Sequence, residues 1–282
     1  MFEVYFESNK EAVTFCQRLF QYDKYFIIHW KTNDEWGNQI KIEVTNSVAN
    51  QPQVIARAMT DVFINHREIN WVKQMVTNNY YYKNKEEIYR IIELAQSIIS
   101  GSDFELNKVV KSKPRNTLFN LFQTYTSENI VHYDSIVNFR FQSYRNELMD
   151  VIGLAIDEYK REEEYQSFIE SLREYVSRKG TYYSTVHVIQ GHNFRYYQSD
   201  GNPFSNSELI EMIKKEPLYI VGLDEEELNL TPLLTMAPKE IIIYGNNPSE
   251  AKTLTIINIF QEKVKFKPLK KFPYPIFLKT KS

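Results

Sequence analysis

The sequence predicts an α+β protein in which a central helical region is flanked by two small sheet-containing units. Two observations lead to this fold class. The stretch Ser135–Lys179 contains no proline and a single glycine, and its apolar residues recur at the three- and four-residue spacing of an amphipathic helix. On both sides of it, short apolar segments are separated by turn residues, which is typical of strands and hairpins.

The composition is that of a soluble globular protein with a substantial core. Of the 282 residues, 43% are hydrophobic and 25% are charged. We divide the chain into an N-terminal α/β unit (1–100), a central helical region (101–180), a C-terminal α+β unit (181–267) and a basic, proline-containing tail (268–282).

The N-terminal unit is expected to contain three strands and three helices. The predicted strands are Phe2–Phe6, Tyr25–Trp30 and Gln39–Val44. The predicted helices are Asn9–Tyr22, a segment that Pro52 opens and that runs to Phe63, and Lys85–Ile99. Gly101–Asp103 is the first clear break after them.

The central region begins with a second break, Lys111–Asn116, and a helix from about Thr117. The long segment Ser135–Lys179 follows. As one helix it would measure about 65 Å, which is too long for a compact domain of this size. We therefore expect two packed helices that meet at the charged run Lys160–Glu164.

In the C-terminal unit the hydrophobic period changes to that of strands. Thr185–Gln190 and Phe194–Gln198 predict a hairpin around Gly191-His192-Asn193, and Ser205–Lys214 predicts a short helix. The strand Lys239–Tyr244 precedes a helix start at which we expect Asn247 as the cap, Pro248 in the first turn and Glu250 completing a capping box. Val264–Phe266 is the last predicted strand, and the tail from Pro268 is expected to be extended or loosely attached.

Several classes of protein are disfavoured. One cysteine, Cys16, excludes an intramolecular disulfide and a cysteine-rich zinc site, and its apolar neighbours predict a buried helix position. The acidic N-terminus is unlike a signal peptide, and no apolar stretch approaches the roughly twenty residues that span a bilayer. These features indicate a cytoplasmic protein.

Charged residues beside the apolar stripe of the long segment are the first candidate site. Arg140, Glu147 and Glu158 fall on the border of the stripe, next to Tyr144, where they could either pair with neighbouring helices or contact a partner protein. We take these four residues as the candidate protein-binding site. No group of residues indicates catalysis, a cofactor or a metal: the chain has no glycine-rich phosphate loop, and its five histidines form no ligand motif. His187 alternates with valines, which predicts a partly buried strand histidine with an ordinary hydrogen bond.

The basic C-terminal segment is the alternative site. Seven lysines and no acid follow Glu262, so the rest of the chain carries −2 − 7 = −9. Aromatic residues interleave with these lysines, as in contacts with single-stranded nucleic acid. The alternative function is therefore a nucleic-acid-binding module that uses Lys265, Lys267, Lys270 and Lys271.

The long segment also resembles a known family. It is similar to the central part of the YtxC-like sporulation proteins of endospore-forming bacteria, and the likeness continues into "LLTMAPKEIIIYG" and "TIINIFQEKVKF". The residues of the long segment that carry it are Arg140, Tyr144, Leu148, Ala155, Asp157-Glu158, Glu164-Tyr165, Phe168-Ile169, Leu172-Arg173 and Val176. The resemblance implies a cytoplasmic, sporulation-associated protein without an assigned activity, for which a non-enzymatic interaction module is the leading hypothesis. Relatives often carry a small cysteine cluster after the last strand; Lys267-Pro268-Leu269-Lys270 stands there instead, so no metal or redox role is carried over.

Overall fold

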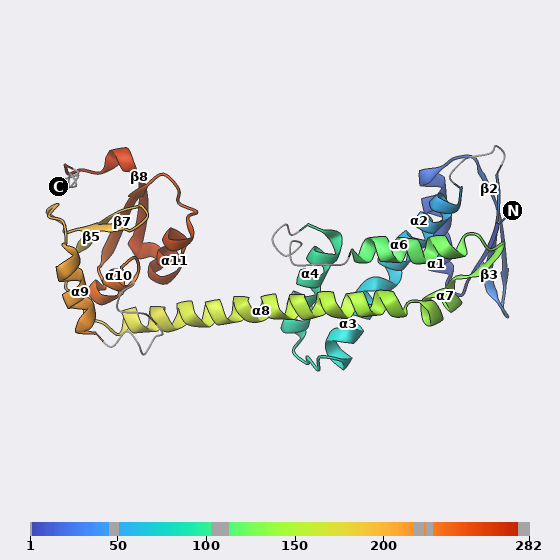
Figure 1. The fold of residues 1–282 in the computed structure, drawn as a ribbon, viewed down its shortest axis with the longest axis horizontal. Helices are drawn as coiled ribbons and strands as arrows, with labels where there is room; N and C mark the ends of the chain where they lie inside the picture. Colours follow the sequence, from blue (N-terminus) through green and yellow to red (C-terminus); the bar gives the residue numbers. More distant parts are fainter. Residues whose placement is uncertain (1, 45–50, 103–112, 217–222, 224–227, 276–282) are drawn as a thin grey trace. The chain divides into compact units, whose positions relative to one another are not determined.

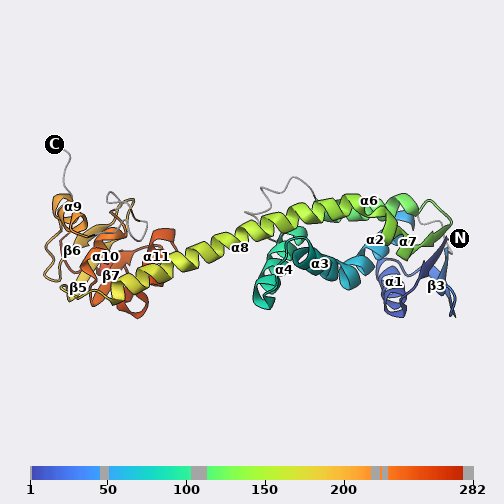
Figure 2. The ribbon, with the colours of Figure 1, turned by 90° about the horizontal axis from the view of Figure 1, so that it is seen from below.

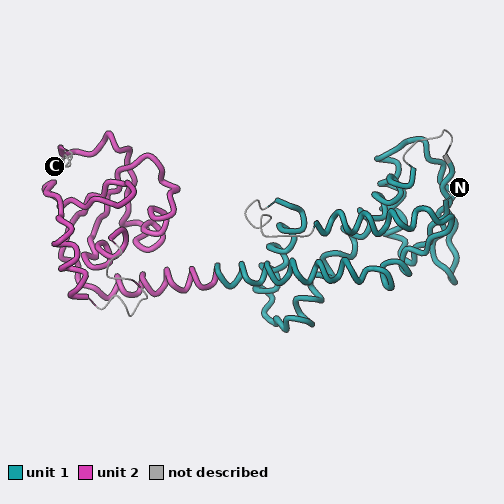
Figure 3. Tube along the Cα trace, viewed as in Figure 1, with its two compact units in different colours: residues 1–161 teal, residues 162–282 magenta. Residues whose placement is uncertain are grey.

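The computed structural model describes residues 2–44, 51–102, 113–216, 223 and 228–275. Its contacts divide the chain into two compact units, Met1–Arg161 and Glu162–Ser282, which Figure 3 distinguishes by colour. Each unit has its own four-stranded sheet among the described residues, so the predicted α+β class is confirmed. The range 101–180, expected as a central helical region, contributes to both units.

Unit 1 begins with the predicted strand–helix–hairpin arrangement (Figure 1). Its strands are β1 (Phe2–Phe6), β2 (Phe26–Asn33), β3 (Gly37–Val44) and β4 (Ile130–His132). They form a sheet in the order β2-β3-β1-β4, in which only the β1–β4 pair is parallel. β4 was not predicted from the sequence because it has three residues, of which only Val131 is buried. The helix α1 (Asn9–Tyr22) matches its prediction and is capped by Ser8.

Of the remaining helices of unit 1, α7 lies beside this sheet, and the others pack on helices, with α3 and α4 farther from the sheet (Figures 1 and 2). They are α2 (Gln51–Phe63), α3 (Ile69–Asn78), α4 (Lys85–Ser100), α6 (Pro114–Tyr125), α7 (Tyr133–Arg140) and the first part of α8 (Gln142–Ser177). α2 and α3 are joined without a break by a π-helical turn, Ile64–Glu68, so the helix predicted to end near Phe63 continues beyond it. α6 starts at Pro114, three residues before the predicted start, because proline is favoured in the first turn of a helix. Gly101 ends α4 in a left-handed conformation (φ 76°), as the predicted break requires.

The long helix α8 corrects the prediction of two helices that meet at Lys160–Glu164. The structure has a single helix from Gln142 to Ser177, and the break lies at Phe141, between α7 and α8. A single helix longer than one compact domain is accommodated because α8 supplies side chains to two cores. Leu148 and Ile152 are buried in the core of unit 1, and Leu172 is buried in the core of unit 2. Most of the charged run is exposed, and neither core includes it.

Unit 2 forms its sheet from β5 (Thr185–Ile189), β6 (Arg195–Tyr197), β7 (Glu240–Gly245) and β8 (Val264–Pro268) in the order β6-β5-β7-β8. The predicted hairpin is the antiparallel β5–β6 pair, while β5, β7 and β8 are parallel. The helices α9 (Asn206–Lys214), α10 (Thr231–Met236) and α11 (Ala251–Phe260) share one hydrophobic core with the sheet. α10 was not predicted, because its six residues, Thr231–Met236, include Pro232 and are too few to show a helical period.

Two features of unit 2 differ from the prediction. Glu250, not Asn247, caps α11, and its carboxylate accepts a hydrogen bond from the backbone N–H of Thr253 (3.1 Å). Gln190 holds the backbone of Asn247 instead, through its N–H (3.1 Å) and its carbonyl (2.6 Å). The tail, expected to be loosely attached, is docked on the sheet as far as it is described; residues 276–282 lie outside the described part.

Candidate protein-binding groove

A groove of about 340 Å³ runs between α3 and the first two turns of α8 in unit 1. The side chains that line it recur at helical spacing on both helices, so each helix presents one face to it. They are Trp71, Gln74, Met75, Asn78 and Asn79 on one side and Gln142, Arg145, Asn146 and Met149 on the other. Five amides, two methionines, a tryptophan and an arginine make up this lining, and none of the nine is acidic.

Trp71 and Arg145 form the centre of the groove. The guanidinium carbon of Arg145 lies 4.3 Å from the centre of the Trp71 ring, a cation–π arrangement. Trp71 is held from behind, because its ring meets Phe63 (5.1 Å) and Phe141 (6.0 Å) edge-on. Among the described residues, Arg145 has no carboxylate partner. The edge of its guanidinium is therefore free to bind an acidic group from outside.

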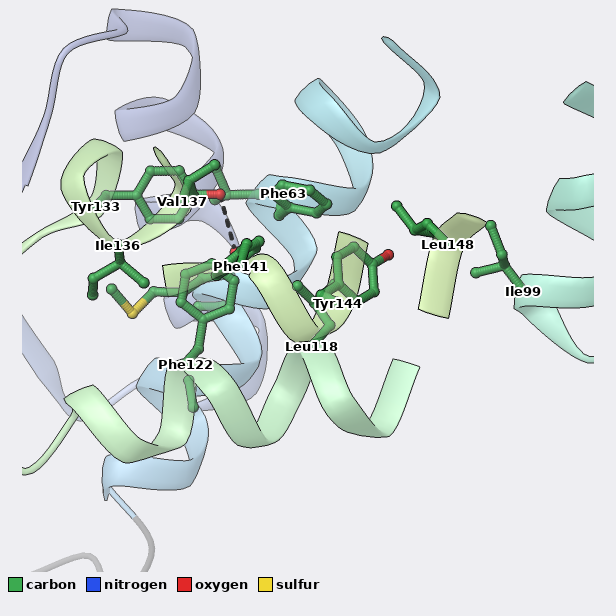
Figure 4. Packing of buried hydrophobic residues seen from close by; sticks show 14 of the residues in the cluster. Phe63, Ile99, Leu118, Phe122, Tyr133, Ile136, Val137, Phe141, Tyr144 and Leu148 are labelled. Carbon is green, nitrogen blue, oxygen red and sulfur yellow. Dashed lines mark hydrogen bonds between the residues drawn. The ribbon is translucent and has the colours of Figure 1, made fainter. Parts of the chain in front are cut away.

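An aromatic core fixes the wall of the groove that α8 provides. Phe63, Phe122, Phe141 and Tyr144 come from different segments and gather at the α7–α8 junction (Figure 4). The Phe141 ring lies 5.1 Å from Phe63 and 5.2 Å from Phe122. Because Phe141 lies in the break between the two helices and is buried, packing against it determines where α8 begins.

Charged side chains of the π-helical turn, Ile64–Glu68, stabilise the same junction between α7 and α8. Glu68 accepts two hydrogen bonds from the Arg115 guanidinium (2.9 and 2.8 Å) and one from the Tyr144 hydroxyl. Burial raises the pKa of Glu68, while the Arg115 charge and the Tyr144 hydroxyl oppose that rise. The neighbouring Arg67 pairs with Glu11 and with Asp134 at the start of α7. One turn thus anchors α7 through Arg67 and α8 through Glu68.

Exposed aromatic side chains lie close in sequence to both walls of the groove. Trp71 lies beside Arg145, and the Tyr80 hydroxyl donates to the Met149 carbonyl (3.1 Å), so α3 and α8 run in the same direction along the groove. Phe139 is 79% exposed and lies three residues before Gln142, where α8 begins. Tyr81 is 76% exposed and lies two residues after Asn79. Tyr81 has a positive φ of 62°, a conformation that few residues other than glycine adopt.

The residues predicted from the sequence as a binding site are dispersed. Arg140 is exposed at the end of α7, two residues before Gln142 of the groove. Tyr144 is fully buried, so a partner cannot reach it in this structure. Glu147 accepts a hydrogen bond from the Thr117 hydroxyl of α6 (2.7 Å), which runs alongside this part of α8 (Figures 1 and 2). Glu158 forms an ion pair with Arg161 one turn further along α8.

The lysines of the alternative site follow one another on β8 and in the turn after it. Lys265 pairs with Glu240 of β7 (2.6 Å), whereas Lys267, Lys270 and Lys271 have no carboxylate partner within the part of the chain that the structure describes. Phe266, between the first two, packs on the core of unit 2. Alternation along β8 therefore directs Lys265 and Lys267 to the opposite face of the sheet.

His187, Cys16, possible metal ligands and the apolar character of the helices were also compared with the expectations from the sequence. His187 is buried on β5 and its Nδ1 lies 3.1 Å from the Tyr244 hydroxyl, so the predicted strand histidine with an ordinary hydrogen bond is confirmed. Cys16 is half-buried on α1, and burial raises the pKa of its thiol to about 11. In the described ranges, no three His, Cys, Asp or Glu side chains are grouped so that they could hold a metal ion. Of the helices in those ranges, none has both the length and the apolar character that crossing a membrane demands.

The groove itself was not predicted from the sequence. The prediction ended a helix near Phe63, and Trp71 and Met75 were therefore not placed on the same surface as Arg145. A usable signal was present: Trp71, Met75 and Asn78 recur at helical spacing, as do Gln142, Arg145 and Met149, and both sets are free of acids.

Comparisons with known proteins agree with the resemblance noted from the sequence. A model of the YtxC-like family matches residues 53–265. The chain is 28% identical over 277 residues to a Bacillus subtilis (strain 168) protein described as uncharacterized protein YtxC, a match that covers 96% of each chain. No solved structure matches the chain.

Proposed function

The chain belongs to the YtxC-like family, and from this premise we propose that it is a non-enzymatic interaction module whose α3–α8 groove binds an acidic segment of a partner protein. The observation that carries the proposal is the composition of the groove. Tryptophan, methionine and arginine are enriched at protein interfaces, and acids and lysine are depleted there. The lining of this groove shows the same bias.

The free guanidinium of Arg145 supports an acidic partner. Stacking on Trp71 covers one face of the guanidinium and leaves its N–H edge available for a bidentate contact with a carboxylate. The amides of Gln74, Asn78 and Asn146 provide hydrogen-bond donors and acceptors around it. A groove between two helices suits an amphipathic helix with apolar side chains at helical spacing and at least one Asp or Glu.

Three of the four residues suggested from the sequence lie outside the proposed contact. Tyr144 is fully buried. Glu147 and Glu158 are engaged within the chain, by Thr117 and Arg161 respectively. Arg140 remains part of the proposed surface because it adjoins the start of α8 and is exposed. It would extend the positive charge of Arg145 toward the exposed Phe139.

We further propose that the protein works in the cytoplasm of sporulating cells. The support for this is the family resemblance, since the described residues themselves carry no signal for a compartment or a developmental stage. Two strains of the native host test this: one lacks the gene, and the other carries a copy that encodes Arg145→Glu in its place. If the groove serves sporulation, both strains should form fewer heat-resistant spores than the wild type. A copy that encodes Lys160→Glu should restore the number of heat-resistant spores.

Site-specific photo-crosslinking tests the groove directly. A photoreactive amino acid at Gln74, which is exposed in the groove, should give one discrete crosslinked protein in sporulating cells. The same amino acid at Gln166, exposed on α8 in unit 2, is the matched control and should give none of that product. Arg145→Glu should reduce the Gln74 crosslink at least about tenfold, as loss of a central arginine contact does.

The control for charge is Lys160→Glu on the same helix, which reverses an exposed charge outside the groove. It should leave the crosslink unchanged. A Gln74 product that persists with Arg145→Glu, or that forms equally from Gln166, would show that the partner binds elsewhere. Absence of a product from Gln74, Gln142 and Asn146 alike would contradict the proposed function.

A further inference from the structure

The sheet of unit 2 has two faces of different character. Strand register places Tyr197, His187, Ile242 and Lys265 in one row across the sheet and Arg195, Ile189, Tyr244 and Lys267 in the next row on the same face. The opposite face holds Val186, Val188, Ile241 and Ile243, which pack against the helices. One face is thus the core, and the other face carries three rings and three cations.

The arrangement of this second face is ordered. Its rings, Tyr197, His187 and Tyr244, lie on β6, β5 and β7, and its cations lie on the edge strands, Arg195 on β6 and Lys265 and Lys267 on β8. Lys270 and Lys271 add two exposed cations in the turn after β8. The acid next to these rows is Glu240, which pairs with Lys265.

The chain's own tail lies on the three rings. The Phe272 ring is 5.0 Å from Tyr197 and 5.1 Å from Tyr244, and the Tyr274 ring is 5.4 Å from His187. The Tyr274 hydroxyl donates to the Ser199 carbonyl (2.6 Å). Under this cover Tyr197 is 3% exposed and Tyr244 is 2% exposed.

Gly201 makes room for the tail. It has a φ of 89°, and a Cβ there would lie 2.4 to 2.8 Å from atoms of the Tyr274 ring. Ring contacts and a hydrogen bond therefore hold the docked segment on the sheet, and the missing side chain of Gly201 leaves room for it. We name Phe272–Pro275 the tail lid.

We propose that this face of the sheet is a binding site for single-stranded nucleic acid and that the tail lid occupies it until a strand displaces the lid. Aromatic side chains on a sheet stack with unpaired bases, and flanking Lys and Arg bind the phosphates. The rings of the tail lid lie on the three rings of the sheet, at the place that bases would occupy. The cations lie on both edges of this group of rings. This differs from the prediction from sequence, in which the tail itself supplied the contact and its removal abolished binding.

Opening the lid in the full-length protein tests this proposal. Fluorescence anisotropy would follow binding of labelled oligothymidylate and oligouridylate of about twelve nucleotides, within the usual site sizes. The variant Phe272→Ala with Tyr274→Ala should bind at least about tenfold more tightly than the wild type, because the lid no longer competes for the rings. Tyr274→Phe, which loses only the hydrogen bond to Ser199, should tighten binding about fivefold or less and guards against misfolding of the double variant.

Phosphate contacts are tested in the lid-open variant. Adding Arg195→Ser and Lys267→Ser should weaken binding and reduce the dependence of log K on log salt by about 1.4, at about 0.7 per phosphate. Lys214→Ser on α9, on the helical side of the sheet, is the matched control and should leave both quantities unchanged. Tighter binding by only one of the two oligonucleotides would still support the site and would identify DNA or RNA as its ligand.

Three results would overturn the proposal. The first is absence of binding by both lid variants at low salt while their thermal melts stay cooperative. The second is equal binding of duplex DNA, which would show attraction by charge without stacking. The third is weaker binding when the lid is opened, which would return the contact to the tail.

Discussion

At the scale of single residues, Tyr81 is held in a conformation that tyrosine rarely adopts. Its φ of 62° places it in the left-handed region, and its side chain is 76% exposed, so no core contact offsets the strain. Such positions usually hold glycine or asparagine. Because Tyr81 follows Asn79 of the groove by only two residues, we expect it to contact the partner that the groove binds.

Replacing Tyr81 by asparagine should separate stability from binding. Asparagine adopts the left-handed conformation more readily, so Tyr81→Asn should leave the free energy of unfolding equal or raise it by up to about 1 kcal/mol. The Gln74 crosslink described above should weaken at the same time. Urea unfolding checks the first expectation; a loss of stability larger than about 1 kcal/mol would show that the Tyr81 side chain supports the fold.

His187 predicts a pH dependence of unit 2. Burial and the nearby Lys267 lower its pKa below the ordinary value of 6.5, and Glu240 acts in the opposite direction. The unfolded chain therefore binds a proton more readily than the folded chain. The stabilisation is fully present above pH 6.5 and is lost as the pH falls through that value toward the lowered pKa.

His187→Gln should remove this dependence. The difference in urea midpoint between about pH 7.5 and about pH 5.5 should be smaller in the variant than in the wild type. Carboxylates in the rest of the protein titrate equally in both proteins, so the comparison isolates His187. An identical difference in the two proteins would contradict the lowered pKa.

At the scale of secondary-structure elements, α8 shows what periodicity can and cannot specify. Its hydrophobic spacing correctly predicted helix for nearly all of Ser135–Lys179, and the predicted bounds of α1 agree with the structure, in which Ser8 caps the start of the helix. The continuity of α8 through Lys160–Glu164 could not be predicted, because local spacing does not reveal that a second core receives Ile169 and Leu172. β4 and α10 lacked any local signal, since tertiary contacts stabilise both.

The candidate groove could not be predicted from the sequence for a related reason. Its two walls lie about seventy residues apart in the chain, and Glu68 links them through interactions with Arg115 of α6 and Tyr144 of α8 that are distant in sequence. Helical geometry places Glu147 on the border of the apolar stripe, but it could not show that the Thr117 hydroxyl donates to one oxygen of its carboxylate. The charge pattern and the hydrophobic periodicity describe one helix at a time, whereas this groove is formed by two helices.

A proline in the exposed part of α8 tests how the helix is supported. Glu163→Pro removes one backbone hydrogen bond and disrupts the helix locally, at a cost of about 3 kcal/mol or more to the helix. Because neither core includes Glu163, the urea midpoints of both units should stay nearly unchanged. Hydrogen exchange should show loss of protection confined to about two turns around the proline. Leu148→Pro, within the unit 1 core, is the contrasting variant and should unfold that unit.

At the scale of the whole molecule, the two cores have no buried residue in common. Phe63 belongs to the core of unit 1 and Ile243 to the core of unit 2, and both are fully buried. Removing either side chain should leave a cavity in one core only. We therefore expect unfolding in two steps, each governed by its own core.

The test is a pair of matched cavity variants. Phe63→Ala should lower the stability of the unit 1 transition by about 3–5 kcal/mol and Ile243→Ala that of the unit 2 transition by about 2–5 kcal/mol, each leaving the other transition in place. The double variant should show the sum of both effects. A single transition that shifts in either variant would show that the two units unfold together.

Gly201 has a consequence for the genetics of this protein. Any substitution there adds a Cβ where the Tyr274 ring lies, in a backbone conformation that other residues rarely adopt. A single missense change at this codon would therefore release the tail from the sheet without altering the tail's own sequence. Alleles of Gly201 and of Phe272 should share a phenotype and fall into one epistasis group, and a screen for gain of nucleic-acid binding should recover both.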